Sequence, residues 1–260
     1  MIAPLVAVVS SSTVVELKWV TVVAVSAIAF LQLRRHPVPR AELIQRLPRC
    51  LAGLCCFGVG IAVFFAAHLG NPPWDVLHGG LSKRTGLPVG LIINIVGVTV
   101  LCLWVPLKER IGLGTALNTV VIGLVVDVVR PSIPDVSAVW LQVLMALGAT
   151  LIIGFGSGLY IGSGLGAGPR DGLMLGLRRF GLSMRVARSL VEAVTLVVGK
   201  LLGGRVGFST VVFLVLIGPV VQFLLPRMSL PPLAEPTPAT TRSSGTGDYV
   251  APPPPYMRPR

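Results

Sequence analysis

Two aspartates in matching sequence settings are the first residues that could carry chemistry. Asp75 follows Leu69-Gly-Asn-Pro-Pro-Trp, and Asp171 follows Leu165-Gly-Ala-Gly-Pro-Arg. A turn with glycine, then a proline and a carboxylate, is typical of a helix start, because proline fits the first turn and the helix dipole stabilises negative charge there. The aspartates are therefore either helix caps or parts of two broken helices that meet near mid-membrane and bind a small polar or ionic solute.

Two further charged residues, Arg170 and Glu192, are candidates for the same site. Arg170 precedes Asp171, whereas Trp74 takes the place of this arginine in the first segment, so a shared site would be asymmetric. Arg170 can pair with Asp171 or reach across to the first segment. Glu192 lies near the centre of an apolar segment, where an unpaired charge is costly. Arg188 lies four residues earlier on the same helical face, so Glu192 is either half of a structural ion pair or a proton or substrate site.

Polar residues elsewhere in the apolar segments are weaker candidates. Asp127 lies close to Arg130 and to a predicted helix end, and Asn118 is of the kind that usually hydrogen-bonds a neighbouring helix. We include both among the candidate pathway residues. His68 and His78 flank the first aspartate segment without a second ligand at metal spacing, so we interpret them as interfacial polar groups. The sequence predicts no catalytic residues, no metal site and no cofactor, and hence no enzyme.

The composition indicates a membrane protein. Hydrophobic residues make up 53% of the 260 residues and charged residues 12%, which leaves too little polar surface for a soluble domain. The apolar runs are long and do not alternate, which indicates helices rather than strands. We attribute the net charge of +12 to cytoplasmic loops and not to nucleic-acid binding. The four cysteines lie in or beside apolar runs and are expected to pack between helices.

The two aspartate segments belong to a duplication that runs through most of the chain. At an offset of about 95 residues, six landmarks keep one register after a single-residue slip. They include Gly58 with Gly154, Pro73 with Pro169, Gly112 with Gly207, Ile122 with Ile217, and Pro131 with Pro226. The chain therefore divides into a first membrane repeat over residues 45–135 and a second over residues 136–226.

Each repeat is predicted to hold three spanning helices. The six core spans are residues 50–69, 88–105, 112–129, 140–165, 183–202 and 207–225. A short helix follows the first span of each repeat and ends near residue 85 or 181. These short helices are too short and too charged to cross, which predicts broken or re-entrant elements. Because three crossings per repeat is an odd number, the second repeat should be inverted relative to the first.

The Lys and Arg distribution agrees with this topology. Outside the spans, sixteen of these residues lie on the side where the first core helix begins and five on the other. Positive charge favours the cytoplasmic side, so the N-terminus of the core and the C-terminus are predicted to be cytoplasmic. Five arginines between Arg34 and Arg49 form a basic segment before the first core helix. Seven glycines between Gly154 and Gly168 lie on an apolar segment, which favours close helix packing over a phosphate-binding loop.

Two segments lie outside the repeats. Residues 1–44 include an apolar stretch over residues 14–33 that is long enough to span, but Glu16 and Lys18 interrupt its outer end. This stretch is either an extra transmembrane helix or part of an N-terminal extension. Residues 227–260 are rich in Pro, Ser, Thr and Gly and are expected to form a disordered cytoplasmic tail.

Several motifs in combination resemble those of the YczE/YyaS/YitT family of bacterial integral membrane proteins, most closely its YczE-like branch. They cover roughly residues 45–226 and are Gly-x-Gly-Ile from Gly58, Leu-Gly-x-x-Pro-Trp-Asp-Val-Leu from Leu69, Gly-Leu-Gly-Thr-x-x-Asn from Gly112, Gly-x-x-x-Asp from Gly123, Leu-Gly-Ala-Gly-Pro-Arg-Asp-Gly-Leu-Met from Leu165, Arg-x-x-x-Glu from Arg188, and Leu-Gly-Gly from Leu202. Pro72 stands where the first copy in this family usually has Ser. The resemblance implies a multi-pass protein of the bacterial plasma membrane and no particular reaction.

These observations lead to two main hypotheses. The first is a small-solute transporter or exporter whose pathway includes the six candidate residues, namely Asp75, Asn118, Asp127, Arg170, Asp171 and Glu192. The second is a membrane scaffold or accessory protein for a partner enzyme or secretion component, which would bind through the basic cytoplasmic face and the tail. The expected partners are the lipid bilayer, an unknown small solute, and a second copy or another protein. An intramembrane enzyme is disfavoured because no catalytic set is present.

Overall fold

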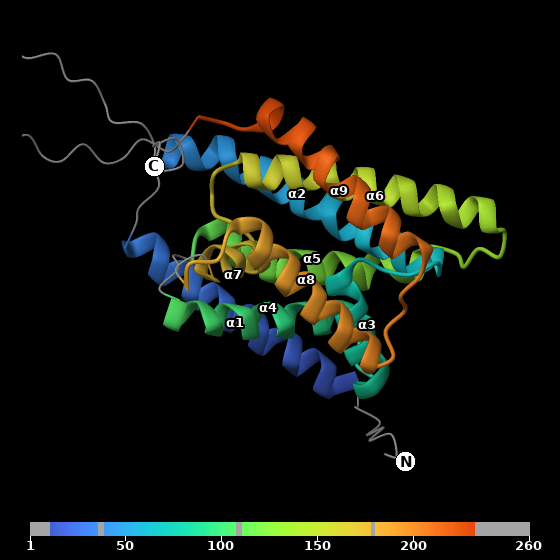
Figure 1. The fold of residues 1–260 in the computed structure, drawn as a ribbon. Helices are drawn as coiled ribbons and strands as arrows, with labels where there is room; N and C mark the ends of the chain where they lie inside the picture. The colour runs from blue at the N-terminus through green and yellow to red at the C-terminus, as the bar shows by residue number, and fades with distance from the viewer. Residues whose placement is uncertain (1–10, 36–38, 108–110, 178–179, 232–260) are drawn as a thin grey trace, which may run out of the picture.

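The chain folds into a bundle of helices (Figure 1). The computed structural model describes residues 11–35, 39–107, 111–177 and 180–231, and these residues contain no strand. In chain order the elements are α1 (Ser11–Arg35), α2 (Arg40–Ala67), α3 (Pro73–Thr85), α4 (Val89–Leu107), α5 (Leu113–Val129), the short 3-10 helix η1 (Arg130–Ser132), α6 (Val139–Gly162), α7 (Pro169–Leu177), α8 (Met184–Leu201) and α9 (Phe208–Met228). Most of the predicted tail, from residue 232 onward, lies outside the described residues.

Fewer helices than the six predicted spans meet a simple test for crossing a membrane. By length and apolarity, α2, α5 together with η1, α6 and α9 qualify within the described residues. The pair α3 and α4 qualifies jointly, but the two helices are bent by 114° relative to each other. The all-helical, multi-pass architecture is therefore confirmed at the level of four to five candidate spans.

Helix α2 occupies a central place in the bundle. It packs against α5 and α6, and α9 packs on α6. At the start of α2, Arg46 donates a hydrogen bond to the carbonyl oxygen of Ser163, just after α6, over 2.8 Å. Just after α2, His68 bonds to Asp135, which precedes α6, over 2.8 Å. The helices α2 and α6 therefore run antiparallel, and Figure 1 shows α9 running in the same direction as α6.

Small residues let α2 and α6 approach closely. A Cβ atom on Gly53 of α2 would lie 2.7 Å from the carbonyl oxygen of Gly156, and one on Gly156 would lie 2.6 Å from that of Gly53. Such glycine contacts are how membrane helices gain packing without a hydrophobic driving force. The predicted packing role of this glycine run is confirmed here. The predicted end of the helix at residue 165 is wrong, because α6 ends at Gly162 and Gly164 has a φ of +71°.

Helix α2 begins ten residues earlier than the predicted start at residue 50, so part of the basic segment is helical. Arg46 is only 2% exposed. Its guanidinium bonds to Glu42 over 2.6 Å, to the carbonyl oxygen of Ser163 and to that of Pro231. These partners compensate for the burial of the charge, and the helix continues through Pro48. The sequence pattern around residue 50 shows none of these distant partners.

The predicted apolar stretch over residues 14–33 lies within helix α1. This helix packs against α5 and α4. Lys18 Nζ forms an ion pair with Asp127 Oδ2 of α5 over 2.7 Å, with side-chain exposures of 29% and 12%. The lysine that interrupts the apolar run therefore has a specific partner in the bundle, and α1 is attached by a charge pair as well as by apolar contact.

The two turns that precede α3 and α7 are bonded in the same reciprocal way. The carbonyl oxygen of Leu69 accepts from Ser209 N at the start of α9, over 3.1 Å, and that of Leu165 accepts from Gly114 N at the start of α5, over 2.8 Å. The glycine after each leucine has a positive φ, which is +109° at Gly70 and +135° at Gly166. Helix α3 then packs on α8, and α7 packs on α4. Each short helix thus contacts the middle long helix of the other half.

Candidate functional site

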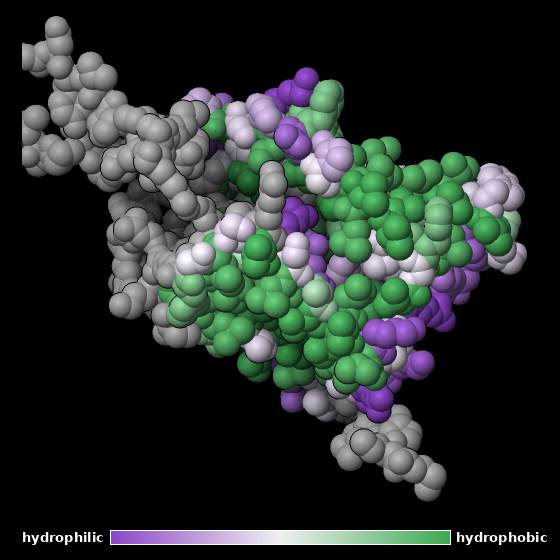
Figure 2. All heavy atoms as spheres, in the orientation of Figure 1, coloured by the Kyte–Doolittle hydropathy of each residue, from purple (hydrophilic) through white to green (hydrophobic). Residues whose placement is uncertain are grey.

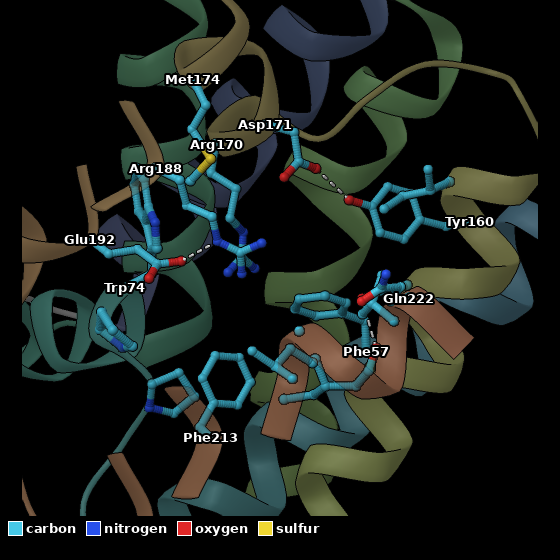
Figure 3. A pocket seen from close by; sticks show the side chains of 18 residues that line it. Phe57, Trp74, Tyr160, Arg170, Asp171, Met174, Arg188, Glu192, Phe213 and Gln222 are labelled. Carbon is cyan, nitrogen blue, oxygen red and sulfur yellow. Dashed lines mark hydrogen bonds and ion pairs between the residues drawn. The ribbon is translucent and has the colours of Figure 1, made fainter. Parts of the chain in front are cut away.

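A cavity of about 320 Å³ opens between the two halves of the chain (Figure 3). Its walls come from six helices and from the turn before α3. The lining residues are Phe57 of α2, Pro72, Pro73 and Trp74 at the start of α3, Ile153, Ser157, Tyr160 and Ile161 of α6, Arg170, Asp171 and Met174 of α7, Arg188 and Glu192 of α8, and Phe213, Ile217, Gly218, Val221 and Gln222 of α9. The beginnings of α3 and α7 therefore face one space, as their matching sequences suggested.

The start of α7 places two of the predicted residues at this cavity. Pro169 opens the helix, and Asp171 lies in its first turn. Asp171 Oδ2 accepts a hydrogen bond from the hydroxyl of Tyr160 in α6 over 2.8 Å. The Arg170 guanidinium lies 4.9 Å from the ring centre of Phe57 in α2, a cation–π distance. Of the two predicted possibilities, Arg170 thus reaches across to the first half rather than pairing with its neighbour.

Helix α8 contributes a charge pair to the cavity. Ser183 caps the helix, since its hydroxyl oxygen accepts from Val186 N. One turn later, Arg188 Nε donates to Glu192 Oε1 over 2.9 Å, and the predicted ion pair is present. Figure 3 shows both side chains directed into the same space as Arg170. The pair therefore lies where it can also meet a ligand, and a proton or substrate role for Glu192 stays a prediction.

The start of α3 differs from that of α7. Trp74 lines the cavity, is 7% exposed, and its indole Nε1 has no hydrogen-bond partner among the described residues. Asp75 does not line this cavity. Its Oδ1 lies 3.0 Å from Nδ1 of His78, and both side chains are buried. The interpretation of His78 as an interfacial group is therefore wrong, because the helix turns it inward to meet Asp75.

Asp127 and Asn118 do not line the cavity between the two halves. Asp127 Oδ1 accepts from Gly90 N at the start of α4 over 2.8 Å, and its other oxygen pairs with Lys18. The expected neighbour Arg130 instead bonds to Asp135. Asn118 lines a smaller cavity of about 40 Å³ that also borders Trp74, His78 and Arg170. Of the six candidates, Arg170, Asp171 and Glu192 line the cavity between the two halves.

Tyr160 is a site residue that the sequence reading missed. It is 3% exposed, it lines the cavity, and it donates the hydrogen bond that Asp171 accepts. The sequence feature that could have identified it is its position as a lone tyrosine within the apolar segment that forms α6. A buried tyrosine usually needs a partner for its hydroxyl, and the nearest carboxylate in the chain is Asp171.

A second recess lies at the opposite end of α2 from Arg46. It has a volume of about 370 Å³ and its lining includes His68, Lys83, Arg130 and Arg205. Just outside it, hydrogen bonds from His68 and Arg130 lower the pKa of the Asp135 carboxyl. Cations thus outnumber the carboxylates at this recess. The described residues hold no group of three or more His, Cys, Asp or Glu that could bind a metal ion.

An all-helical fold with several candidate spans and a charged cavity inside it defines a multi-pass membrane protein. The chain belongs to a family of unknown function, DUF6198, whose model matches residues 44–226, and its relatives place it in the YczE-like group.

Three relatives support this assignment. An "Uncharacterized protein" of Haemophilus influenzae is 41% identical over 176 residues, which is 67% of this chain and 81% of the relative. The "Uncharacterized membrane protein YczE" of Bacillus subtilis is 32% identical over 72% of this chain and 89% of its own length. The "Uncharacterized protein YyaS" of the same organism is 31% identical over 67% and 89%. No solved structure matches the chain.

Proposed function

We propose that the protein is a plasma-membrane transporter or exporter of a small solute, with its binding site in the cavity between the two halves. The observation that carries this proposal is the lining of that cavity, because the helix starts after both proline turns and the Arg188–Glu192 pair face one space. A volume of about 320 Å³ lies within the range of small-molecule sites, which begins at roughly 300 Å³.

Inverted repeats are part of the proposal. In this arrangement α2, α4 and α5 cross in the first repeat, α6, α8 and α9 cross in the second, and α3 and α7 are re-entrant. The reciprocal bonds from Ser209 to Leu69 and from Gly114 to Leu165 support it, as does the packing of each short helix on the other half. In inverted-repeat transporters the substrate site lies at the repeat interface and is formed by broken helices.

The cost of the site also supports a functional role. Each charge inside a membrane span costs roughly 3 kcal/mol or more unless it is paired. The cavity nevertheless holds Arg170, Asp171, Arg188 and Glu192. A helix interface that served packing alone would be more stable with apolar residues of similar size, because desolvating charges offsets most of their attraction.

The scaffold hypothesis gains less support from the contacts. It needs a basic cytoplasmic face that is free to bind a partner. Arg46 is buried against two backbone carbonyl oxygens, and Arg49 donates to the carbonyl oxygen of Met228. These two arginines therefore hold the ends of α6 and α9 in place and are already occupied.

A filled-cavity variant tests the proposal. Gly218 of α9 lines the cavity, and a Cβ atom placed there meets nothing within 4 Å, so Gly218→Phe should fill the space without displacing the backbone. Gly148 of α6 has the same free surroundings but does not line the cavity, so Gly148→Phe is the matched control. Each purified protein is heated with amino acids, carboxylates, nucleosides, sugars, inorganic ions and fatty acids, and its unfolding temperature is recorded.

We expect at least one compound class to raise the unfolding temperature of the wild type and of Gly148→Phe but not of Gly218→Phe. A compound that meets this criterion is then tested for movement across proteoliposomes. Absence of any stabilising class, or stabilisation that persists in Gly218→Phe, would reject the cavity as the site and leave the scaffold hypothesis in its place.

A further inference from the structure

We infer that the ligand of this cavity is an amphipathic anion, an acidic head group on an apolar chain, and that it enters sideways from the membrane between α8 and α9. This inference rests on the proposed function and specifies its substrate class. Three features of the cavity carry it, namely its unmatched hydrogen-bond donors, its apolar walls and the direction in which it opens.

Two arginines and two carboxylates line the cavity, and Arg170 is the arginine that forms no ion pair among the described residues. Glu192 is paired with Arg188, and Asp171 accepts from the Tyr160 hydroxyl. Arg170 forms no hydrogen bond with the described residues, and its guanidinium lies over the ring face of Phe57. The buried Nε1 of Trp74 is a second unmatched donor at the same cavity. A positive guanidinium and a spare N–H are complementary to the oxygens of a carboxylate or phosphate.

The remaining walls favour an apolar chain attached to that head. The cavity is also lined by Phe57, Trp74, Ile153, Met174 and Phe213. All five are buried hydrophobic residues that belong to the core clusters, and Phe57 faces the Arg170 guanidinium. Sites that bind ligands are mostly apolar with a few polar groups that fix orientation, and here those polar groups select a negative head.

The cavity opens toward the surface of the bundle between α8 and α9. Figure 2 shows hydrophilic side chains gathered in a hollow there, between two apolar surfaces. The side chain of Arg188 is 49% exposed. On either side, Leu190 and Val194 of α8 and Leu214 and Val215 of α9 are exposed apolar residues. In a bilayer such surfaces face lipid chains, so the opening connects the charged cavity with the hydrocarbon.

The depth of the charges suits a molecule that enters from the bilayer. At a rise of 1.5 Å per residue, Arg188 lies about 6 Å along α8 from Met184, and Glu192 lies about 12 Å along it. A head group bound by Arg170 beside this pair would thus sit within the first half of the 18-residue α8, while its chain extends through the opening into the hydrocarbon. Both a free fatty acid and an anionic phospholipid have this chemistry.

Quenching of Trp74 fluorescence by a brominated ligand tests the inference. Trp19 and Trp140 are 64% and 67% exposed, so replacing both by Phe removes the tryptophans that bulk lipid would quench. Trp104 stays, buried and bonded to the carbonyl oxygen of Pro169. This protein, in a neutral detergent, is titrated with dibrominated stearate and, separately, with dibrominated phosphatidylglycerol. Oleate, butyrate and inorganic phosphate are the competitors.

We expect saturable quenching that oleate reverses and that butyrate and phosphate do not. Arg170→Gln should weaken the apparent affinity about tenfold, and Arg170→Lys should retain most of it because the charge remains. Lys200→Gln, which removes an exposed cation from the other end of α8, is the control and should not change the titration. Saturation by stearate identifies a free acid as the ligand, and saturation by phosphatidylglycerol alone identifies a bilayer lipid.

Two outcomes would overturn the inference. One is quenching that rises without saturation and is equal in the wild type and in Arg170→Gln. The other is stabilisation by a hydrophilic solute that Gly218→Phe abolishes, in a protein that neither brominated probe quenches. The second result would leave the proposed transport function standing, whereas failure of both assays would remove the two proposals together.

Discussion

At the scale of single residues, the Arg188–Glu192 pair can be tested by a double-mutant cycle. Glu192→Gln leaves the Arg188 guanidinium without its carboxylate, and Arg188→Gln leaves the carboxylate without its cation. We expect each change to cost about 1–3 kcal/mol of stability, since it strands a desolvated charge. The double variant should lie closer to the wild type because no charge remains. The measurement is reversible unfolding in mixed micelles.

The two charges would be independent if the loss of stability in the double variant equalled the sum of the losses in the two single variants. In that case neither residue depends on the other, and Glu192 would be available as a proton or substrate site in the resting protein. The same cycle therefore also separates the two sequence interpretations of Glu192.

Two equivalent threonines provide a second test at this scale. Thr115 Oγ1 accepts from Gly112 N over 3.2 Å and donates to the carbonyl oxygen of Ala167 over 2.6 Å. Thr210 Oγ1 accepts from Gly207 N over 3.1 Å, and the described residues offer it no acceptor. Thr115→Val should therefore cost about 1 kcal/mol more than Thr210→Val, the value of one hydrogen bond. Equal losses by thermal unfolding would mean that the bond to Ala167 contributes nothing.

At the scale of elements, the ion pair between Lys18 and Asp127 links helix α1 to the bundle. Lys18→Met should leave the Asp127 carboxylate, 12% exposed, without its cation while it still accepts from Gly90 N. Breaking a fully buried pair costs about 3–5 kcal/mol, and this partly exposed pair should cost less. Adding Asp127→Asn should restore much of the loss, because a neutral amide oxygen can still accept the hydrogen bond.

The measurement is the unfolding of the wild type, Lys18→Met, Asp127→Asn and the double variant, together with the protease accessibility of α1 in each protein. If Lys18→Met alone leaves both unchanged, α1 is held by apolar packing and the charge pair is incidental. Because the family match begins at residue 44, this cycle also asks whether a helix outside the family region stabilises the family core.

Local signals in the sequence located most elements well. Proline or glycine turns and a serine cap placed the starts of α4, α5 and α8 within one residue of those predicted. The start of α2 could not be found in this way, because the acceptors of Arg46 lie 117 and 185 residues away in the chain. Local patterns report propensity and capping, whereas burial of a charge depends on partners that only the fold brings close.

The sequence also predicted the candidate site in part. The duplication predicted that the turns at Leu69 and Leu165 are equivalent, and the structure places the starts of α3 and α7 at one cavity. It did not predict that Asp75 turns to His78 while Asp171 turns to Tyr160. That difference arises because the two repeats differ around the aspartates: Met174 takes the place of His78 in α7, and Phe64 takes the place of Tyr160 in α2.

At the scale of the whole molecule, the inverted arrangement makes a prediction about membrane sides. Lys83 lies at the end of α3, and Phe180, 73% exposed, lies just after α7. If α3 and α7 are re-entrant from opposite faces, single cysteines at these two positions should react with a membrane-impermeant maleimide from opposite sides of oriented vesicles. The native cysteines are first replaced by alanine, because Cys55 and Cys102 are exposed.

Arg205 and Arg227 extend this test to the helix that follows. They lie before and near the end of α9, and a spanning α9 places cysteines there on different sides. Arg205→Cys should label together with Lys83→Cys, since Gly203, Gly204 and Lys83 border one recess. Labelling of the Lys83 and Phe180 positions from the same side would mean that the repeats are parallel. The inverted-repeat part of the proposal would then be wrong, and a site between broken helices that enter from opposite faces would have to be abandoned.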